Sequence, residues 1–153
     1  MINTTLTLNF PAVCGRDVKV DFDGGDISSD AGVALVAAAD RKIGLIRTLA
    51  TCIEDRREQK KVGHSIQALM QERVYAIAMG YEDANDLDRL RFDPALKTAC
   101  GRLPKTGKDL GSQPTISRFE NGLSKRDLVR MAHILAEKVI GEIRSDSKKV
   151  TID

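Results

Sequence analysis

The sequence lacks a long hydrophobic run, a closely spaced cysteine pair and a strong excess of one charge. No apolar stretch approaches the roughly 20 residues that a membrane-spanning helix needs. The first residues, MINTTLTLNFPAV, also lack the basic and apolar regions of a secretory signal. We therefore expect a cytoplasmic protein with no membrane partner. Its 153 residues, 42% hydrophobic and 30% charged, suit a single compact domain.

Residues for a metal centre or a complete active site are equally scarce. Cys14, Cys52 and Cys100 form no CxxC pair and have no histidine at zinc-site spacing. The sequence therefore predicts reduced thiols. Neither His64 nor His133 has the surroundings of a catalytic triad, and no glycine-rich phosphate loop is present.

The positive charge is concentrated in the last third of the chain. The net charge is only +2, which by itself does not indicate a nucleic-acid-binding protein. Residues 102–153 carry 11 basic and 7 acidic side chains, whereas residues 1–101 carry 13 and 15. Any nucleic-acid contact is therefore expected in the last third.

The hydrophobic periodicity predicts a mainly α fold (α+β), in which several helices follow a small N-terminal β element. Alternation in TLTLNF and DVKVDF predicts two short antiparallel strands. Pro104 and Gly107 predict a basic loop over residues 102–111. Helical spacing and end signals predict helices in AGVALVAAADRK, again after Gly44, from Ser65 to Gly80, from Asp93 to Gly101, from Pro114 to Glu120, and from Ser124 through Ile143.

Two acidic segments resemble metal sites only superficially. In GYEDANDLDRLRFDP, a calcium loop starting at Asp83 would place Leu87 and Asp88 where an oxygen ligand and a glycine are required. We interpret Asp83 and Asp93 as helix N-caps instead. FDGGDISSD is more typical of a turn before a helix than of a metal or acid-base site. We expect the remaining carboxylates of the first segment to form ion pairs, Asp86 and Asp88 with Arg89 and Arg91.

The strongest functional signal is GSQPTISRFENG, at residues 111–122. Thr115, Ser117 and Arg118 would lie near the start of a short helix, the end that enters the major groove in helix-turn-helix proteins. Arg118 can contact a guanine edge or a phosphate, and Gln113 and Asn121 can pair with an adenine edge or the backbone. The flanking cations expected to contact phosphates are Lys105, Lys108, Lys125, Arg126 and Arg130.

This segment resembles the second helix of repressor-type helix-turn-helix domains. The residues before it contain Pro104 and Gly107 and would form a poor first helix. The segment is therefore a candidate helix-turn-helix-like element, and a purely structural helix remains the alternative.

Three ordered segments together resemble one protein family. They are FDGGDISSDAGVALV, then IEDRREQKKVGHSIQALMQERVYAIAMGYEDANDLDRLRFDPALK, then LGSQPTISRFEN. The chain resembles the N-terminal region of bacterial insertion-sequence transposases of the DDE type, in the IS-thirteen-eighty group. The resemblance extends over nearly the whole chain.

The resemblance implies a division of the chain. Residues 1–147 would form the helical N-terminal domain, and residues 148–153, KKVTID, would begin the first strand of a truncated RNase-H-like catalytic domain. Asp153 would then be the first catalytic acidic residue. In the intact family this residue acts with two other acidic residues and Mg²⁺ or Mn²⁺. Because those two residues have no counterpart here, we expect a fragment that is not an enzyme by itself and holds no metal or other cofactor.

Three hypotheses for function follow. The leading one is binding of transposon-end DNA during transposition. The second is an assembly or dimerisation scaffold for the catalytic domain with little DNA affinity. The third is a truncated regulator that inhibits transposition. The expected partners are transposon-end DNA and either a second copy of the chain or intact transposase.

Overall fold

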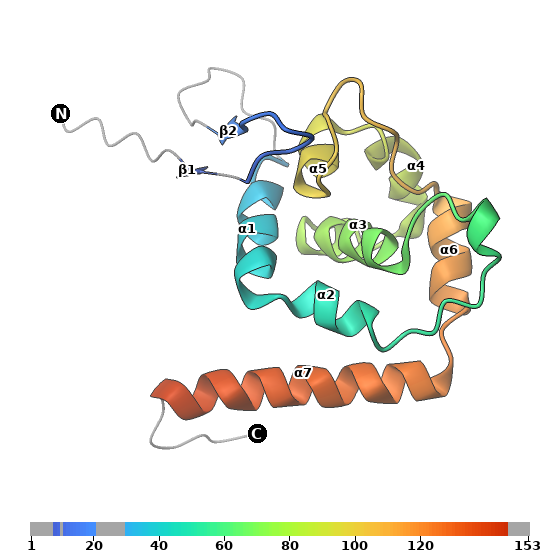
Figure 1. Cartoon of the computed structure of the whole chain (residues 1–153). Helices are drawn as coiled ribbons and strands as arrows, with labels where there is room; N and C mark the ends of the chain where they lie inside the picture. The colour runs from blue at the N-terminus through green and yellow to red at the C-terminus, as the bar shows by residue number, and fades with distance from the viewer. Residues whose placement is uncertain (1–7, 10, 21–29, 147–153) are drawn as a thin grey trace.

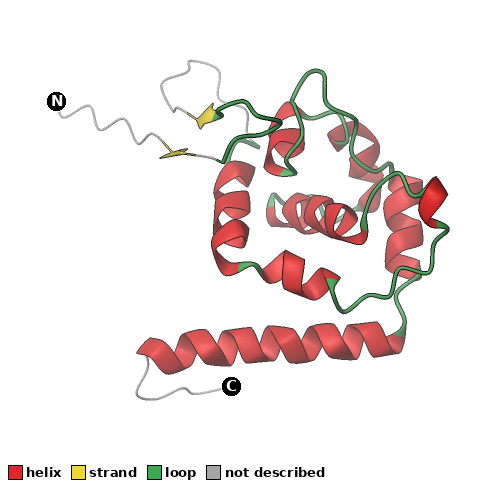
Figure 2. Ribbon diagram, viewed as in Figure 1, coloured by secondary structure: helices red, strands yellow, loops and turns green. Residues whose placement is uncertain are grey.

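The computed structural model describes residues 8–9, 11–20 and 30–146, and helices dominate this part of the chain (Figures 1 and 2). The mainly α prediction is confirmed. The strands are β1 (Leu8–Asn9) and β2 (Lys19–Val20), and the 3-10 helices are η1 (Gln59–Lys61) and η2 (Ala84–Asp86). The α-helices are α1 (Val33–Ile43), α2 (Leu45–Ala50), α3 (Ile66–Ala78), α4 (Leu87–Leu90), α5 (Pro94–Ala99), α6 (Gln113–Asn121) and α7 (Lys125–Asp146).

Helix α3 is the centre of the molecule, and α1, α2, α5 and α6 pack around it (Figure 1). Its first turn is capped by Ser65, whose Oγ accepts a hydrogen bond from the Ala68 N–H at 3.1 Å. It ends at Ala78, and Gly80, which follows the C-cap Met79, has a φ of 95°, so a glycine terminates the helix in the left-handed conformation. Four of its apolar side chains are buried in the core: Leu69, Met70, Tyr75 and Ala76.

The corner between α1 and α2 depends on Gly44 and Asp40. Gly44 has a φ of 68° and separates the two helices, as predicted. The Asp40 carboxylate accepts from the Ile46 N–H at 2.9 Å and from the Tyr75 hydroxyl at 3.0 Å. Burial and this carboxylate raise the pKa of Tyr75. Asp40 therefore caps α2 and also joins the corner to α3.

The N-terminal β element contains a short antiparallel ladder and an isolated bridge between Val13 and Arg16. β1 and β2 are antiparallel, with Leu8 opposite Val20 and Asn9 opposite Lys19, which confirms the predicted pairing. From the acidic turn at 22–30 the structure describes Asp30, whose carboxylate accepts from the Tyr81 hydroxyl at 3.1 Å. The rest of that turn and the strand predicted at 148–153 lie outside the described residues.

The acidic segment at 80–94 has a structural role, and both of its predicted helix N-caps are confirmed. Asp83 accepts from the Asn85 N–H at 2.9 Å, and Asp93 accepts from the Leu96 N–H at 2.7 Å. The predicted ion pairs within the segment are wrong. Asp88 accepts instead from the backbone of Gln113, and Arg91 pairs with Asp109 at 3.6 Å, because the fold brings more distant groups closer.

None of the described helices is long and apolar enough to cross a membrane.

We predict that Gly44→Ala lowers the free energy of unfolding by about 1–2 kcal/mol, because a Cβ is strained at positive φ. Gly141→Ala is the matched control. Gly141 lies inside α7 and a Cβ there would meet no heavy atom within 4 Å, so alanine should add about 0.5–1 kcal/mol. Urea denaturation of both variants measures these changes. Equal effects of the same sign would contradict the role assigned to Gly44.

Candidate nucleic-acid interface

Helix α6 begins one residue earlier than predicted. Ser112 is the extended N-cap, and Gln113 rather than Pro114 is the first helical residue. Proline disfavours helical backbone in the preceding residue. Here the Gln113 N–H donates to the Asp88 carboxylate at 3.0 Å, which holds Gln113 at the helix start.

The inner face of α6 packs on the core. Ile116 is fully buried and Phe119, three residues later on the same side of the helix, is half-buried. Glu120 forms an ion pair with Arg73 of α3 at 2.5 Å. The same guanidinium donates to the carbonyl oxygens of Tyr81 and Glu82. Arg73 therefore holds the C-terminal half of α6 against α3.

The loop before α6 is held by a buried carboxylate. Glu72 of α3 is 1% exposed, and its Oε2 accepts from the Gly111 N–H at 2.6 Å. Oε1 has no hydrogen-bond partner. Burial raises the pKa of Glu72 to about 7, although the Gly111 N–H, Arg102 and Arg91 act in the opposite direction. A Cβ at Gly111 would lie 3.0 Å from this carboxylate, so glycine permits the close approach.

Three basic side chains stabilise the loop at 102–111, which is irregular as predicted. Lys97, 3% exposed, donates to the Gly107 carbonyl at 2.7 Å. Arg102 donates to the carbonyls of Lys108 and Asp109 and lies 2.9 Å from His64 Nδ1. Burial, with Arg102 and other cations, lowers the pKa of His64. The Lys108 ammonium donates to the Gly63 carbonyl at 3.0 Å.

The outer face of α6 carries the polar residues proposed to contact DNA. Two of them bond within the helix, because Gln113 Nε2 donates to Ser117 Oγ at 3.1 Å. Thr115 Oγ1 lies 3.0 Å from the Ser112 hydroxyl. Arg118 and Asn121 are exposed, and within the described part of the chain their side chains have no hydrogen-bond or ion-pair partner. They are therefore the residues on this face most available to an external ligand.

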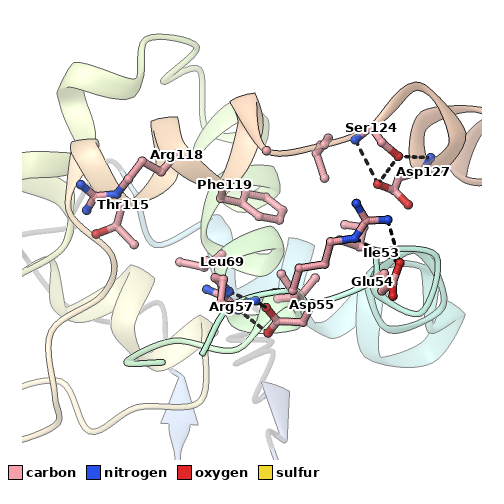
Figure 3. Close-up of a pocket in the computed structure, with 14 residues that line it drawn as sticks. Ile53, Glu54, Asp55, Arg57, Leu69, Thr115, Arg118, Phe119, Ser124 and Asp127 are labelled. Atoms are coloured by element: carbon pink, nitrogen blue, oxygen red, sulfur yellow. Dashed lines mark hydrogen bonds and ion pairs between the residues drawn. The ribbon is translucent and has the colours of Figure 1, made fainter. Parts of the chain in front are cut away.

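A pocket of about 400 Å³ opens beside this face (Figure 3). Thr115 and Arg118 lie at one end of the pocket, and Ser124 and Asp127 lie at the other. Its apolar wall is formed by Ile53, Ile66, Leu69, Phe119 and Leu123.

The segment at 54–57 forms the remaining wall of the pocket. Arg56 pairs with Glu54 at 2.9 Å, and Arg57 pairs with Asp55 at 2.7 Å. The hydrogen bond from Arg57 lowers the pKa of Asp55 to about 2. The sequence indicates only a charged connection here, and its place beside α6 follows from tertiary packing.

The five flanking cations lie on the elements before and after α6 (Figure 1). Lys105, Lys125 and Arg126 are exposed. Lys108 contacts Gly63, and Arg130 donates to the Cys52 carbonyl at 3.4 Å. Within the described residues, Lys105, Lys125 and Arg126 have no hydrogen-bond or ion-pair partner, whereas Lys108 and Arg130 also connect segments of the fold.

The helices around this surface do not follow the repressor arrangement. Residues 100–112, which separate α5 from α6, contain no helix. The closely connected pair is α6 and α7, joined by Gly122, Leu123 and Ser124 and lying crosswise in Figure 1. A capping box starts α7 at Ser124, because Asp127 accepts from the Ser124 N–H at 3.0 Å and its own N–H donates to Ser124 Oγ at 3.2 Å.

Within residues 8–9, 11–20 and 30–146, no three histidine, cysteine, aspartate or glutamate side chains converge to form a metal site. Asp153 lies outside these ranges, so its predicted catalytic role stays a prediction. The described residues do not fit a divalent ion, and we derive no metal-dependent step from them.

Comparison with known families identifies the protein as a DDE transposase. The family described as Transposase DDE domain group 1 matches residues 10–153. The chain therefore belongs to this family. No curated protein and no solved structure matches the chain.

The family corrects one expectation from the sequence. We expected a chain that is not an enzyme, because two acidic residues of the catalytic triad had no recognisable counterpart. The matched family is a catalytic transposase domain and is therefore enzymatic, so that classification is wrong. A missing sequence motif was weaker evidence than a match that extends over most of the chain.

We predict that Glu72 makes the stability of the protein decrease as the pH rises. Its folded pKa of about 7 is above the ordinary value of 4.5, so its stabilising contribution is complete below pH 4.5 and is lost as the pH rises through 7. The neutral Glu72→Gln variant avoids this loss. The variant should match the original protein near pH 5 and exceed its free energy of unfolding by on the order of 2–3 kcal/mol near pH 8.

Denaturant unfolding at a series of pH values measures this difference. His64 acts in the opposite direction, because its lowered pKa removes stability as the pH falls. Both proteins contain His64, so its contribution cancels in the comparison. Parallel stability curves for the two proteins would show that Glu72 does not titrate in this range.

Proposed function

We propose that this transposase domain binds transposon-end DNA through the outer face of α6, and that the protein belongs to the IS-thirteen-eighty group. The main observation behind this proposal is that the Arg118 guanidinium is exposed beside the pocket and has no partner among the described residues. A free guanidinium on a short helix can form a forked contact with a guanine edge or a phosphate. Membership of a transposase family supports DNA as the ligand.

The rigid attachment of α6 supports this proposal. Three contacts hold the helix and the segment leading into it: Glu72 to Gly111, Asp88 to Gln113, and Glu120 to Arg73. A side chain that recognises a base edge binds more tightly when its backbone is already fixed, because ordering the backbone only on binding would reduce the affinity. The outer face of α6 is therefore suited to sequence-specific contact.

The cations beside α6 are suited to phosphate contacts. Lys105 precedes the helix, and Lys125 and Arg126 begin α7 immediately after it. Phosphate contacts position a protein on the duplex but carry little sequence information. We propose that these three cations set the position of the protein along the duplex and contribute affinity. We assign base recognition to Arg118, and the further candidates are Asn121, Gln113, Thr115 and Ser117.

We predict that Arg118→Ala weakens binding to a duplex of the element's terminal sequence by about 1–3 kcal/mol, or roughly 5- to 150-fold. Lys42→Ala is the control, because Lys42 is exposed on α1, across α3 from α6 (Figure 1). Fluorescence anisotropy against terminal and scrambled duplexes measures both affinity and preference. If Arg118→Ala kept the same preference for the terminal over the scrambled duplex, Arg118 would not take part in base recognition.

We predict that the double variant Lys125→Ala, Arg126→Ala weakens binding to terminal and scrambled duplexes equally. Each lost phosphate contact should reduce the slope of log K against log salt by about 0.9. Titrations at several salt concentrations measure this slope, and Arg118→Ala provides the contrast. A slope equal to that of the original protein would show that these two cations lie away from the DNA.

A further inference from the structure

His64 is held in one tautomer by Arg102. The Arg102 guanidinium lies 2.9 Å from His64 Nδ1. An arginine side chain can only donate hydrogen bonds, so Nδ1 accepts and the ring proton is on Nε2. Within the described residues the Nε2–H has no hydrogen-bond partner, and the Nε2 atom is not buried. His64 therefore offers an N–H donor in a fixed orientation to an external acceptor.

Two cations beside His64 have no carboxylate within ion-pair distance in the part of the chain that the structure describes. Arg102 donates to the carbonyl oxygens of Lys108 and Asp109. The Lys108 ammonium donates to the carbonyl of Gly63, the residue directly before His64, at 3.0 Å. An ammonium has three N–H donors, so Lys108 keeps two for another acceptor.

Positive charge converges on His64 from separate parts of the sequence. Burial and four surrounding cations lower the pKa of His64, so the ring is neutral near pH 7; the cations are Arg102, Lys108, Arg91 and Arg57. The last two form ion pairs with carboxylates, whereas the first two do not. Glu72 also interacts with Arg102, but its pKa of about 7 leaves it only partly ionised. Uncompensated positive charge therefore remains at His64, Arg102 and Lys108, which we call the His64 site.

The His64 site lies beside the elements that carry the candidate DNA-binding face. The loop at 102–111 leads directly into α6 (Figure 1). Ile66, two residues after His64, lines the same pocket as Arg118. The major groove of DNA is only about 12 Å wide, so a helix in the groove has backbone phosphates close to it on both strands. A duplex on the outer face of α6 is therefore well placed to bring a phosphate to the His64 site.

We propose that the His64 site binds a phosphate group of the DNA backbone. The His64 Nε2–H and the Lys108 ammonium donate to its oxygens, and Arg102 holds the imidazole ring in place. Phosphate oxygens form their strongest hydrogen bonds with charged donors, which Lys108 supplies. That the phosphate comes from DNA rests on the proposed function, whereas a phosphate site at His64 does not. The proposal places a contact in the first two-thirds of the chain, where the charge balance predicts none.

The ring NMR signals of His64 test the site directly, because the chain has only two histidines. His133, exposed on α7, is the internal control. We expect inorganic phosphate, added at constant ionic strength, to shift the His64 signals and leave those of His133 unchanged. Lys108→Ala should weaken this phosphate binding by roughly three- to fivefold. Lys108→Arg keeps the charge and should retain the binding, which separates loss of charge from loss of the fold.

A duplex of the element's terminal sequence identifies the source of the phosphate group. We expect the duplex to shift the His64 signals and to prevent any further shift by inorganic phosphate. A duplex that binds without affecting His64 would overturn the assignment to DNA, and the absence of a shift with either ligand would overturn the site itself. A shift with inorganic phosphate in a chain that binds no duplex would support the site while rejecting the proposed function.

Discussion

The hydrogen bond between the buried Glu72 carboxylate and the Gly111 N–H is the constraint on which the candidate site depends. It joins the central helix α3 to the residue that precedes the cap of α6. A carboxylate is costly to bury, and one of its oxygens has no partner. The bond therefore fixes where α6 begins at the expense of stability at high pH.

The loop before α6 and the C-terminal end of α6 are also held in place, which fixes the candidate DNA-binding face. The loop at 102–111 is closed by Lys97 and Arg102, which satisfy its carbonyl groups. The far end of α6 is held by the ion pair of Glu120 with Arg73. The exposed Arg118 thus projects from a helix fixed at both ends, beside a pocket that segments distant in sequence create.

Helices α6 and α7 present surfaces of different character. α6 presents polar groups beside a pocket, and α7 presents an apolar row that the described residues leave uncovered, formed by Leu128, Leu135 and Val139.

Local signals were reliable in this sequence because they act over a few residues. Gly44, Gly80 and the caps at Asp83, Asp93 and Ser124 were correctly predicted from their neighbours. Such side chains bond to backbone groups within one turn, so no knowledge of the fold is needed. The helical class of the fold followed from the same short-range patterns.

Tertiary structure alone decided the long-range contacts. The pairing of Asp88 with Gln113 and of Arg91 with Asp109, the pocket wall at 54–57 and the uncovered row of α7 all depend on which helices meet. Periodicity shows that a helix has an apolar side, but it does not identify the surface that covers that side. The sequence by itself therefore determined the longer helices, the caps at Asp83, Asp93 and Ser124, and the polar face of α6, but not the short α4 or the exact start of α6 at Gln113. Packing around α3 decided which of those groups are buried, which are paired, and which remain free to bind a partner.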